Sequence, residues 1–138
     1  TPYEEAGTNE KGVMVSATET LYGMKTVLAE DPYVDNGIEE AEITTVLLSE
    51  AATAREGVAL LTSIYDTTGA AGGSGVFIAD QNETWFVENL TGHTYIALKP
   101  SARSTWTTPK TWSPPQIWWK WPRRPGPLWE MPLPMSSI

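Results

Sequence analysis

Residues 1–100 predict an α+β fold in which an antiparallel sheet carries a layer of helices on one face. Three observations predict it: one segment has the two-residue period of a strand, two segments have helical spacing, and three strand-like segments follow in succession. The chain of 138 residues is suited to one domain at most. One sheet and one helical layer would leave part of the surface of the sheet uncovered.

The first strand is predicted over residues 13–18, directly after a turn-like Asn-Glu-Lys-Gly sequence at residues 9–12. Val13, Val15 and Ala17 recur at every second position, and successive side chains of a strand point to opposite faces. We therefore expect these three residues to face the helices.

Two helices are predicted next. The first follows the turn at residues 35–37 and begins near Ile38, with several acidic residues near its N-terminus, where the helix dipole favours negative charge. The second begins after Thr53, which has the spacing of a capping box with Glu56. The apolar positions of the first helix are Ala41 or Ile43, Val46 and Leu47, and those of the second are Ala54, Val58, Leu61 and Tyr65.

Three strands joined by short turns complete this part of the chain. The glycine-rich residues 69–75 come before them, and we interpret these residues as a flexible connector, because a phosphate loop would need a Gly-Lys-Ser/Thr ending and a following helix. The strands are predicted at residues 76–79, 84–89 and 94–99, with turns at 80–83 and 91–92. Their close succession predicts an antiparallel β-meander.

The composition changes near Pro100. All Trp residues except Trp85, and most of the 11 Pro residues, follow it, whereas all acidic residues except Glu130 precede it. Residues 101–138 show no apolar period, and interior Pro residues break helices. We therefore divide the chain into a partial domain at 1–100 and a disordered or irregular Trp/Pro-rich tail at 101–138.

The composition also excludes several classes of function. A net charge of −8 disfavours nucleic acid as a partner, because phosphate contacts need clustered Lys and Arg. With no Cys and His93 as the single His, we expect no metal site, and nothing in the sequence indicates a cofactor. No apolar run is long enough to span a bilayer, so we expect no membrane partner.

Some side chains could serve either chemistry or the fold alone. Glu88 and His93 could form an acid–base pair across a turn, although we favour a solvated pair. Arg55 could bind a carboxylate through two hydrogen bonds, although an exposed position on the helix is favoured. Glu19 ends an otherwise small and apolar strand, where a buried carboxylate would need a partner such as an amino group; the alternative is an exposed strand end.

Several motifs in series resemble one known family. They are residues 9–20, Asp31-Pro32, residues 54–58, residues 82–85 and Gly92-His93. In this order they closely resemble the bacterial peptidase-D-type dipeptidases, which are N-terminal-nucleophile cysteine hydrolases. Bile-salt hydrolases and penicillin V acylases are more distant relatives that share the Asn-Glu-Lys-Gly turn and the strand after it. The resemblance covers about residues 1–99, and the series of motifs makes it specific.

The resemblance implies a four-layer αββα sandwich and the hydrolysis of dipeptides. In this family a Cys exposed at the N-terminus attacks the amide carbonyl, and its own α-amino group acts as the base. The acylase relatives have an Asn that contributes to the oxyanion hole or contacts substrate at the position of Glu19. A carboxylate there suits the free ammonium of a dipeptide, so we assign Glu19, Thr18 and Asn9 to substrate binding. A homo-oligomer like those of the family is left open, and a cytoplasmic location is favoured.

The nucleophile that the resemblance implies is missing, because the chain contains no Cys. The first five residues resemble a segment that the family places well inside its chain, so we interpret Thr1 as a truncation point and expect this chain alone to be inactive.

A frameshift near Pro100 would explain the tail. Trp has a single codon, so residues 117–122, re-read from the third base of each codon, largely dictate an acidic and apolar segment that resembles the family's continuation after its meander. The alternative is a genuine tail that acts as a polyproline-type ligand, which would make the protein a non-enzymatic binding module. We hypothesise the frameshift.

Overall fold

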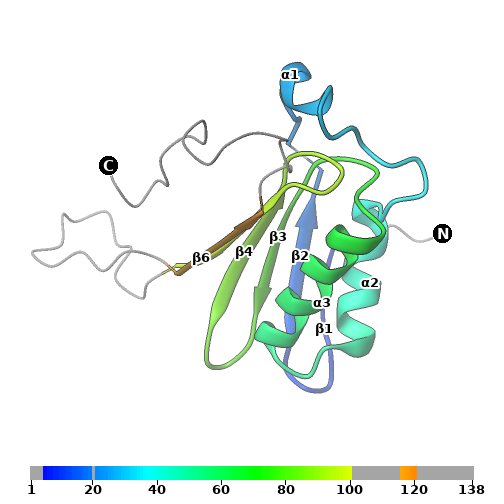
Figure 1. The fold of residues 1–138 in the computed structure, drawn as a ribbon. Helices are drawn as coiled ribbons and strands as arrows, with labels where there is room; N and C mark the ends of the chain where they lie inside the picture. The colour runs from blue at the N-terminus through cyan, green and yellow to red at the C-terminus, as the bar shows by residue number, and fades with distance from the viewer. Residues whose placement is uncertain (1–4, 20, 101–115, 121–138) are drawn as a thin grey trace, which may run out of the picture.

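A six-stranded antiparallel sheet forms the framework of the computed structural model (Figure 1), which describes residues 5–19, 21–100 and 116–120. The strands lie side by side in the order in which they occur in the chain. They are β1 (Ala6–Thr8), β2 (Met14–Thr18), β3 (Ser74–Ala79), β4 (Thr84–Asn89), β5 (Tyr95–Lys99) and β6 (Gln116–Lys120). Every connection within 74–99 is therefore a hairpin, which confirms the predicted meander.

Two long helices cover one face of this sheet. α2 (Glu40–Glu50) packs against β1 and β2, and α3 (Ala54–Thr67) packs against β3, β4 and β5. The two helices lie next to each other (Figure 1), whereas the short α1 (Lys25–Leu28) lies at one end of the sheet. The α+β fold with a single helical layer is confirmed for the described residues.

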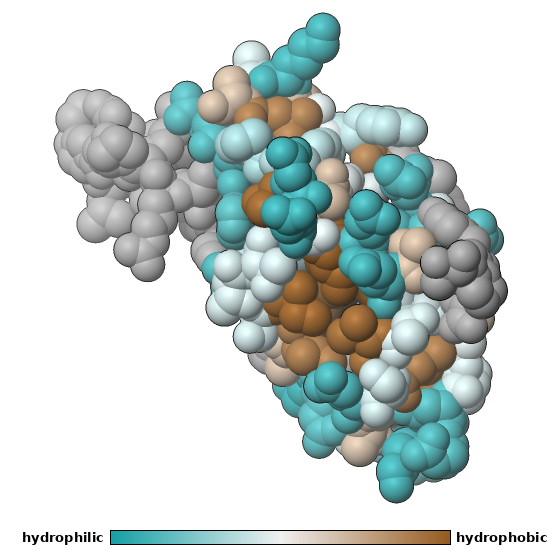
Figure 2. Space-filling model, turned by 90° about the vertical axis from the view of Figure 1, so that its right-hand side faces the viewer, coloured by the Kyte–Doolittle hydropathy of each residue, from teal (hydrophilic) through white to brown (hydrophobic). Residues whose placement is uncertain are grey.

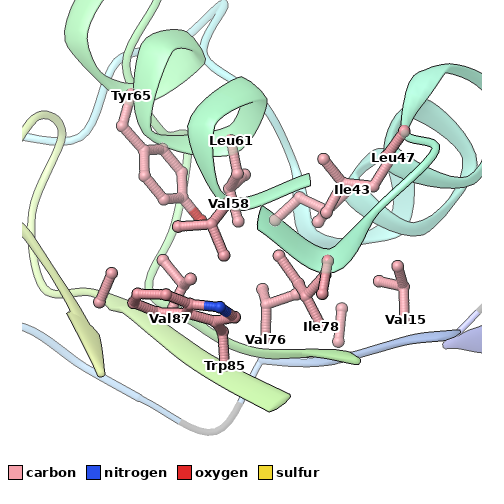
Figure 3. Close-up of a cluster of buried hydrophobic side chains, with 14 of the residues drawn as sticks. Val15, Ile43, Leu47, Val58, Leu61, Tyr65, Val76, Ile78, Trp85 and Val87 are labelled. Atoms are coloured by element: carbon pink, nitrogen blue, oxygen red, sulfur yellow. The ribbon is translucent and has the colours of Figure 1, made fainter. Parts of the chain in front are cut away.

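The core lies between the sheet and this helical layer (Figure 3). Val13, Val15 and Ala17 are buried while the residues between them are exposed, as the two-residue period predicted. From the helices, the predicted residues Ile43, Leu47, Ala54, Val58, Leu61 and Tyr65 are all buried, whereas Ala41 and Val46 are half-buried. Each buried Val, Leu or Ile side chain contributes roughly 1.5–3 kcal/mol by leaving water.

α3 begins at its predicted signal, whereas α2 begins at Glu40, two residues after the predicted start near Ile38. The backbone N–H of Glu56 donates to Oγ1 of Thr53 at 3.1 Å, which confirms Thr53 as the N-cap of α3. The start of α3 is also tied to the sheet, because the N–H of Ala54 donates to Oδ2 of Asp80 at 2.8 Å. Glu39 and Glu42 form a reciprocal capping box at the start of α2.

The prediction of a flexible connector at 69–75 is wrong for its second half. β3 begins at Ser74, and Gly73, Ser74 and Gly75 are buried. A Cβ on Gly73 would overlap the carbonyl oxygen of Leu21, so glycine is required there by close backbone packing. Gly73 and Gly75 are therefore closely packed parts of the fold.

The prediction of an irregular tail is wrong for residues 116–120, which form β6 and pair with β5 in antiparallel register from Tyr95↔Lys120 to Lys99↔Gln116. The remainder of the predicted tail lies outside the described residues. So does the Pro-rich part on which the binding-module alternative depends.

The face of the sheet opposite the helices carries no layer formed by the described residues. Met14 and Phe77 lie on it with 49% and 50% of their surface exposed. The ring of Phe77 contacts that of Phe86 across the strands at 4.8 Å between centroids. Figure 2 shows that apolar side chains also reach the surface on the side of α2. The described residues therefore form two layers, and the implied four-layer sandwich stays a prediction.

Candidate functional site

The predicted substrate-binding residues Thr18 and Glu19 lie at the end of β2. Thr18 is exposed and pairs with Gly75 of β3, and Glu19 follows it directly. Oε1 of Glu19 would lie 3.4 Å from a Cβ on Gly72, so its carboxylate reaches the start of β3. Glu19 is exposed, which matches the alternative of an exposed strand end and not a buried carboxylate. Its role in substrate binding stays a prediction.

Asn9 lies in the turn between β1 and β2, at the opposite end of β2. Its Nδ2 donates to the carbonyl oxygens of Leu48 at 3.0 Å and Ala51 at 2.7 Å. Its Oδ1 accepts hydrogen bonds from the backbone N–H groups of Lys11 and Val13, both at 3.0 Å. Five strand residues span roughly 17 Å, so the structure does not bring Asn9 together with Glu19. The predicted contact between Asn9 and substrate stays a prediction. The observed hydrogen bonds of Asn9 connect the β1–β2 turn to the C-terminal end of α2.

His93 pairs with Asp31 and not with Glu88, so the considered Glu88–His93 pair is not formed. Nδ1 of His93 lies 2.9 Å from Oδ1 of Asp31. Oδ2 of the same carboxylate accepts hydrogen bonds from Oγ1 of Thr91 at 2.6 Å, from the N–H of His93 at 2.7 Å and from Oγ1 of Thr94 at 3.2 Å. Burial raises the pKa of Asp31, but the hydrogen bonds from Thr91 and His93 outweigh this effect and hold the pKa below its ordinary value.

Pro32 and Tyr33, which follow Asp31, also contact the turn between β4 and β5. A Cβ on Gly92 would overlap the carbonyl oxygen of Pro32, so the two backbones touch. The hydroxyl of Tyr33 donates to the carbonyl oxygen of Leu90 at 3.3 Å and accepts from the N–H of Gly23 at 3.1 Å. Sequence reasoning missed Tyr33 altogether, since its only signal is its place after the Asp31-Pro32 motif.

A buried polar network fixes the start of β3 to the end of β4. Oδ1 of Asn89 accepts from the N–H of Ser74 at 2.9 Å and from its Oγ at 2.7 Å, and Nδ2 of Asn89 donates to the carbonyl oxygens of Gly72 and Thr91. Oγ of Ser74 also lies 3.2 Å from the hydroxyl of Tyr65, whose pKa is raised by burial. Since every polar atom of Asn89 has a partner, the network is rigid.

These contacts gather at a single end of the sheet, where β2 and β4 end and β3 and β5 begin. We call it the α1 end, because α1 lies beside it (Figure 1). It comprises Thr18, Glu19, Leu21, Gly23, Asp31, Tyr33, Gly72, Gly73 and residues 90–94. Thr18 and Glu19 are thus exposed polar residues next to backbone that packs closely against neighbouring segments. An exposed carboxylate in such a place is suited to the binding of a cationic group.

Arg55 is engaged at the other end of the sheet. Its Nε and Nη2 donate to the two carboxylate oxygens of Glu83 at 3.1 and 3.0 Å, so it binds a carboxylate in the bidentate manner although 49% of its side chain is exposed. Lys99 also donates to Glu83, and Arg55 stacks over the ring of Trp85 at 5.3 Å. Hydrogen bonds from Lys99 and Arg55 hold the pKa of Glu83 below its ordinary value. These contacts close the β3–β4 hairpin against α3.

Within the part of the chain that the structure describes, no three His, Asp or Glu side chains are grouped so that they could hold a metal ion. None of the helices described is both long enough and apolar enough to cross a membrane.

Comparisons with known proteins assign the chain to a group. The sequence profile of peptidase family C69 matches residues 2–112, which extends past Pro100 into the predicted tail. The chain is 46% identical over 97 residues to "Probable dipeptidase B" of Streptococcus pyogenes serotype M1, a match that covers 70% of this chain and 20% of that protein.

Two further relatives are similar to the same degree. "Probable dipeptidase" of Latilactobacillus sakei is 44% identical over 96 residues, with 70% of this chain and 20% of that protein covered. "Probable dipeptidase" of Salmonella dublin is 45% identical over 101 residues, with 72% and 23% covered. The chain therefore spans about a fifth of the length of the curated relatives that it matches.

Proposed function

Because this chain belongs to peptidase family C69, we propose that it forms part of a dipeptidase, an enzyme that hydrolyses the peptide bond of dipeptides. The observation that carries the proposal is an identity of 44–46% to probable dipeptidases of three different bacteria over 70–72% of this chain. Identity of that degree over a continuous segment supports a shared fold of the segment and a shared role in the whole enzyme.

The nucleophile in this proposal is a Cys at the N-terminus of the complete enzyme. The 138 residues contain no Cys, so they supply the site with binding groups and not with the attacking atom. An N-terminal Cys needs no separate His, because its own α-amino group can take the thiol proton near neutral pH. This chain alone is therefore expected not to hydrolyse dipeptides.

Glu19 is the proposed partner of the free ammonium of the dipeptide, and its neighbour Thr18 is proposed to contribute to the same site. Its exposure supports this role, and no described residue forms an ion pair with it. An ammonium–carboxylate pair is a charge-assisted hydrogen bond, which is about twice as strong as a neutral one. The pair would also select unblocked dipeptides over acylated ones, because acylation removes the charge.

The uncovered face of the sheet supports the four-layer arrangement. The half-exposed Met14 and Phe77, with Phe86 beside them, are large apolar side chains that a second sheet would bury. In the complete enzyme this chain would supply one sheet and its helical layer, and the other two layers would come from residues outside it. A homo-oligomer and a cytoplasmic location stay predictions.

The test is a substitution in a complete family member that carries Glu at the position of Glu19. We expect Glu19→Gln to raise KM for unblocked dipeptides about tenfold, equivalent to ~1.4 kcal/mol, with a smaller change in kcat. The matched control is Glu10→Gln, since Glu10 is an exposed carboxylate in the turn before β2. Unchanged KM in the Glu19 variant would remove Glu19 from the substrate site.

A further inference from the structure

We infer that Tyr33, supported by Asp31, is a positioning residue that fixes the chain at Glu19. We call residues 31–33 the strap: all three contact the turn between β4 and β5, and Tyr33 also accepts a hydrogen bond from Gly23, which lies beyond Glu19 in the chain. The inference rests on the proposed function, because the position of Glu19 matters to catalysis only if Glu19 binds substrate. The proposed link between Tyr33 and the position of Glu19 concerns residues of this chain alone.

The strap contacts the turn between β4 and β5 through all three of its residues. Asp31 accepts hydrogen bonds from Thr91, His93 and Thr94, with distances of 2.6–3.2 Å. The next residue, Pro32, touches the backbone of Gly92, and Tyr33 donates to the carbonyl oxygen of Leu90 at 3.3 Å. All three strap residues thus contact residues 90–94, and Asn89 ties that turn to β3.

Tyr33 of the strap also contacts Gly23, which lies beyond Glu19 in the chain. The N–H of Gly23 donates to the hydroxyl of Tyr33 at 3.1 Å, and a Cβ on Gly23 would overlap the carbonyl oxygen of Leu90. Closer to Glu19, the carbonyl oxygen of Leu21 lies against Gly73, and the Tyr33 hydroxyl would lie 2.9 Å from a Cβ on Gly73. One oxygen atom, the Tyr33 hydroxyl, therefore stands where the two segments and Gly73 meet.

Glu19 lies between two fixed points. Thr18 before it pairs with Gly75 in the sheet, and Leu21 after it packs against Gly73 and Gly75. Strand pairing alone would fix the backbone only before Glu19, at Thr18. Without the contacts of Leu21 and Gly23, the position of the Glu19 side chain would be less well defined. A fixed backbone lowers the entropy cost of placing the carboxylate against a ligand.

The test removes the single oxygen atom. In the 138-residue chain, Tyr33→Phe leaves the N–H of Gly23 without its acceptor and keeps the ring. We expect amide hydrogen exchange at Gly23 to become at least about tenfold faster. We also expect the NMR signals of the Glu19 amide and carboxylate carbon to shift, which is the readout specific to positioning. The matched control is Tyr95→Phe, which also removes a single hydroxyl group; that of Tyr95, in β5, donates to Oδ2 of Asp66 in α3 at 3.5 Å.

Asp31→Asn is the second variant and tests the other end of the strap. His93 is the only His in the chain, so its imidazole NMR signal reports unambiguously whether the contact with Asp31 is lost. We expect this variant to shift the signals of both His93 and Glu19. If the Glu19 signals stay unchanged in Tyr33→Phe and in Asp31→Asn while Gly23 and His93 respond, the strap supports the fold alone and the inference is overturned.

The NMR test of Tyr33 and the kinetic test of Glu19 can fail independently of each other. Unchanged KM in Glu19→Gln would refute the substrate role and leave the measured coupling between Tyr33 and Glu19 as it is. If both hold, Tyr33→Phe in the complete enzyme should raise KM for unblocked dipeptides with little change in kcat. It should have no such effect on N-acetylated dipeptides, which lack the ammonium.

Discussion

At the scale of single residues, Asn89 and Asp31 determine the geometry of the α1 end. The side chain of Asn89 is fully buried and satisfies four hydrogen bonds, and Asp31 accepts four from the β4–β5 turn. A buried polar group that loses its partner costs about 1–3 kcal/mol, so such residues fix positions that apolar packing leaves adjustable. The sequence did show Asp31-Pro32 and Gly92-His93 as motifs. It could not show that Asp31 and His93 meet, because 62 residues separate them and local periodicity carries no information about such contacts.

The lowered pKa of Asp31 predicts a dependence of stability on pH. A carboxyl group whose pKa is lower in the folded than in the unfolded chain stabilises the fold above its unfolded pKa, near 3.8, and loses this contribution as the pH falls through the folded pKa. We therefore expect the stability advantage of the wild type over Asp31→Asn, measured by urea unfolding, to shrink as the pH falls below about 4. An advantage that grows in acid would contradict this sign.

At the scale of elements, the predictions succeeded where a local signal was long enough to be read. The alternation of Val13, Val15 and Ala17 identified β2, and the spacing of Thr53 and Glu56 identified the start of α3. β1 has three residues and α1 has four, so both are too short for a repeating apolar pattern to be recognised. The close packing of Gly73 also escaped prediction, because a glycine that allows close packing and a glycine in a flexible linker look alike in sequence.

The N-cap of α3 is expected to contribute to the stability of the fold. Thr53→Ala removes the acceptor of the Glu56 N–H, and we expect the free energy of unfolding to fall by about 1 kcal/mol. Ser63→Ala is the matched control, because Ser63 is exposed within the same helix. Equal urea midpoints for the two variants would show that the Thr53 hydroxyl contributes nothing to the start of α3.

At the scale of the whole molecule, the chain resembles one half of a sandwich. Helices cover one face of the sheet, and the other face exposes half of Met14 and half of Phe77 to solvent. The α+β class could be predicted from the order of the elements, because two helices followed by a meander leave few arrangements. The four-layer fold came only from the family resemblance, since a second sheet has no counterpart among the described residues. Substantial apolar surface in such a half is expected to be covered in the complete enzyme.

Nucleotide sequencing of the encoding gene together with several hundred bases on either side, read in all three frames, would test whether this chain is part of a dipeptidase gene. We predict an upstream in-frame segment that begins with Cys in the mature enzyme, and a family-like continuation in a shifted frame after about Pro100. A start codon directly before Thr1, with one intact reading frame through Ile138 and early stops in the shifted frame, would contradict it. The chain would then be a small protein in its own right, and its Trp/Pro-rich tail would be the place to look for function.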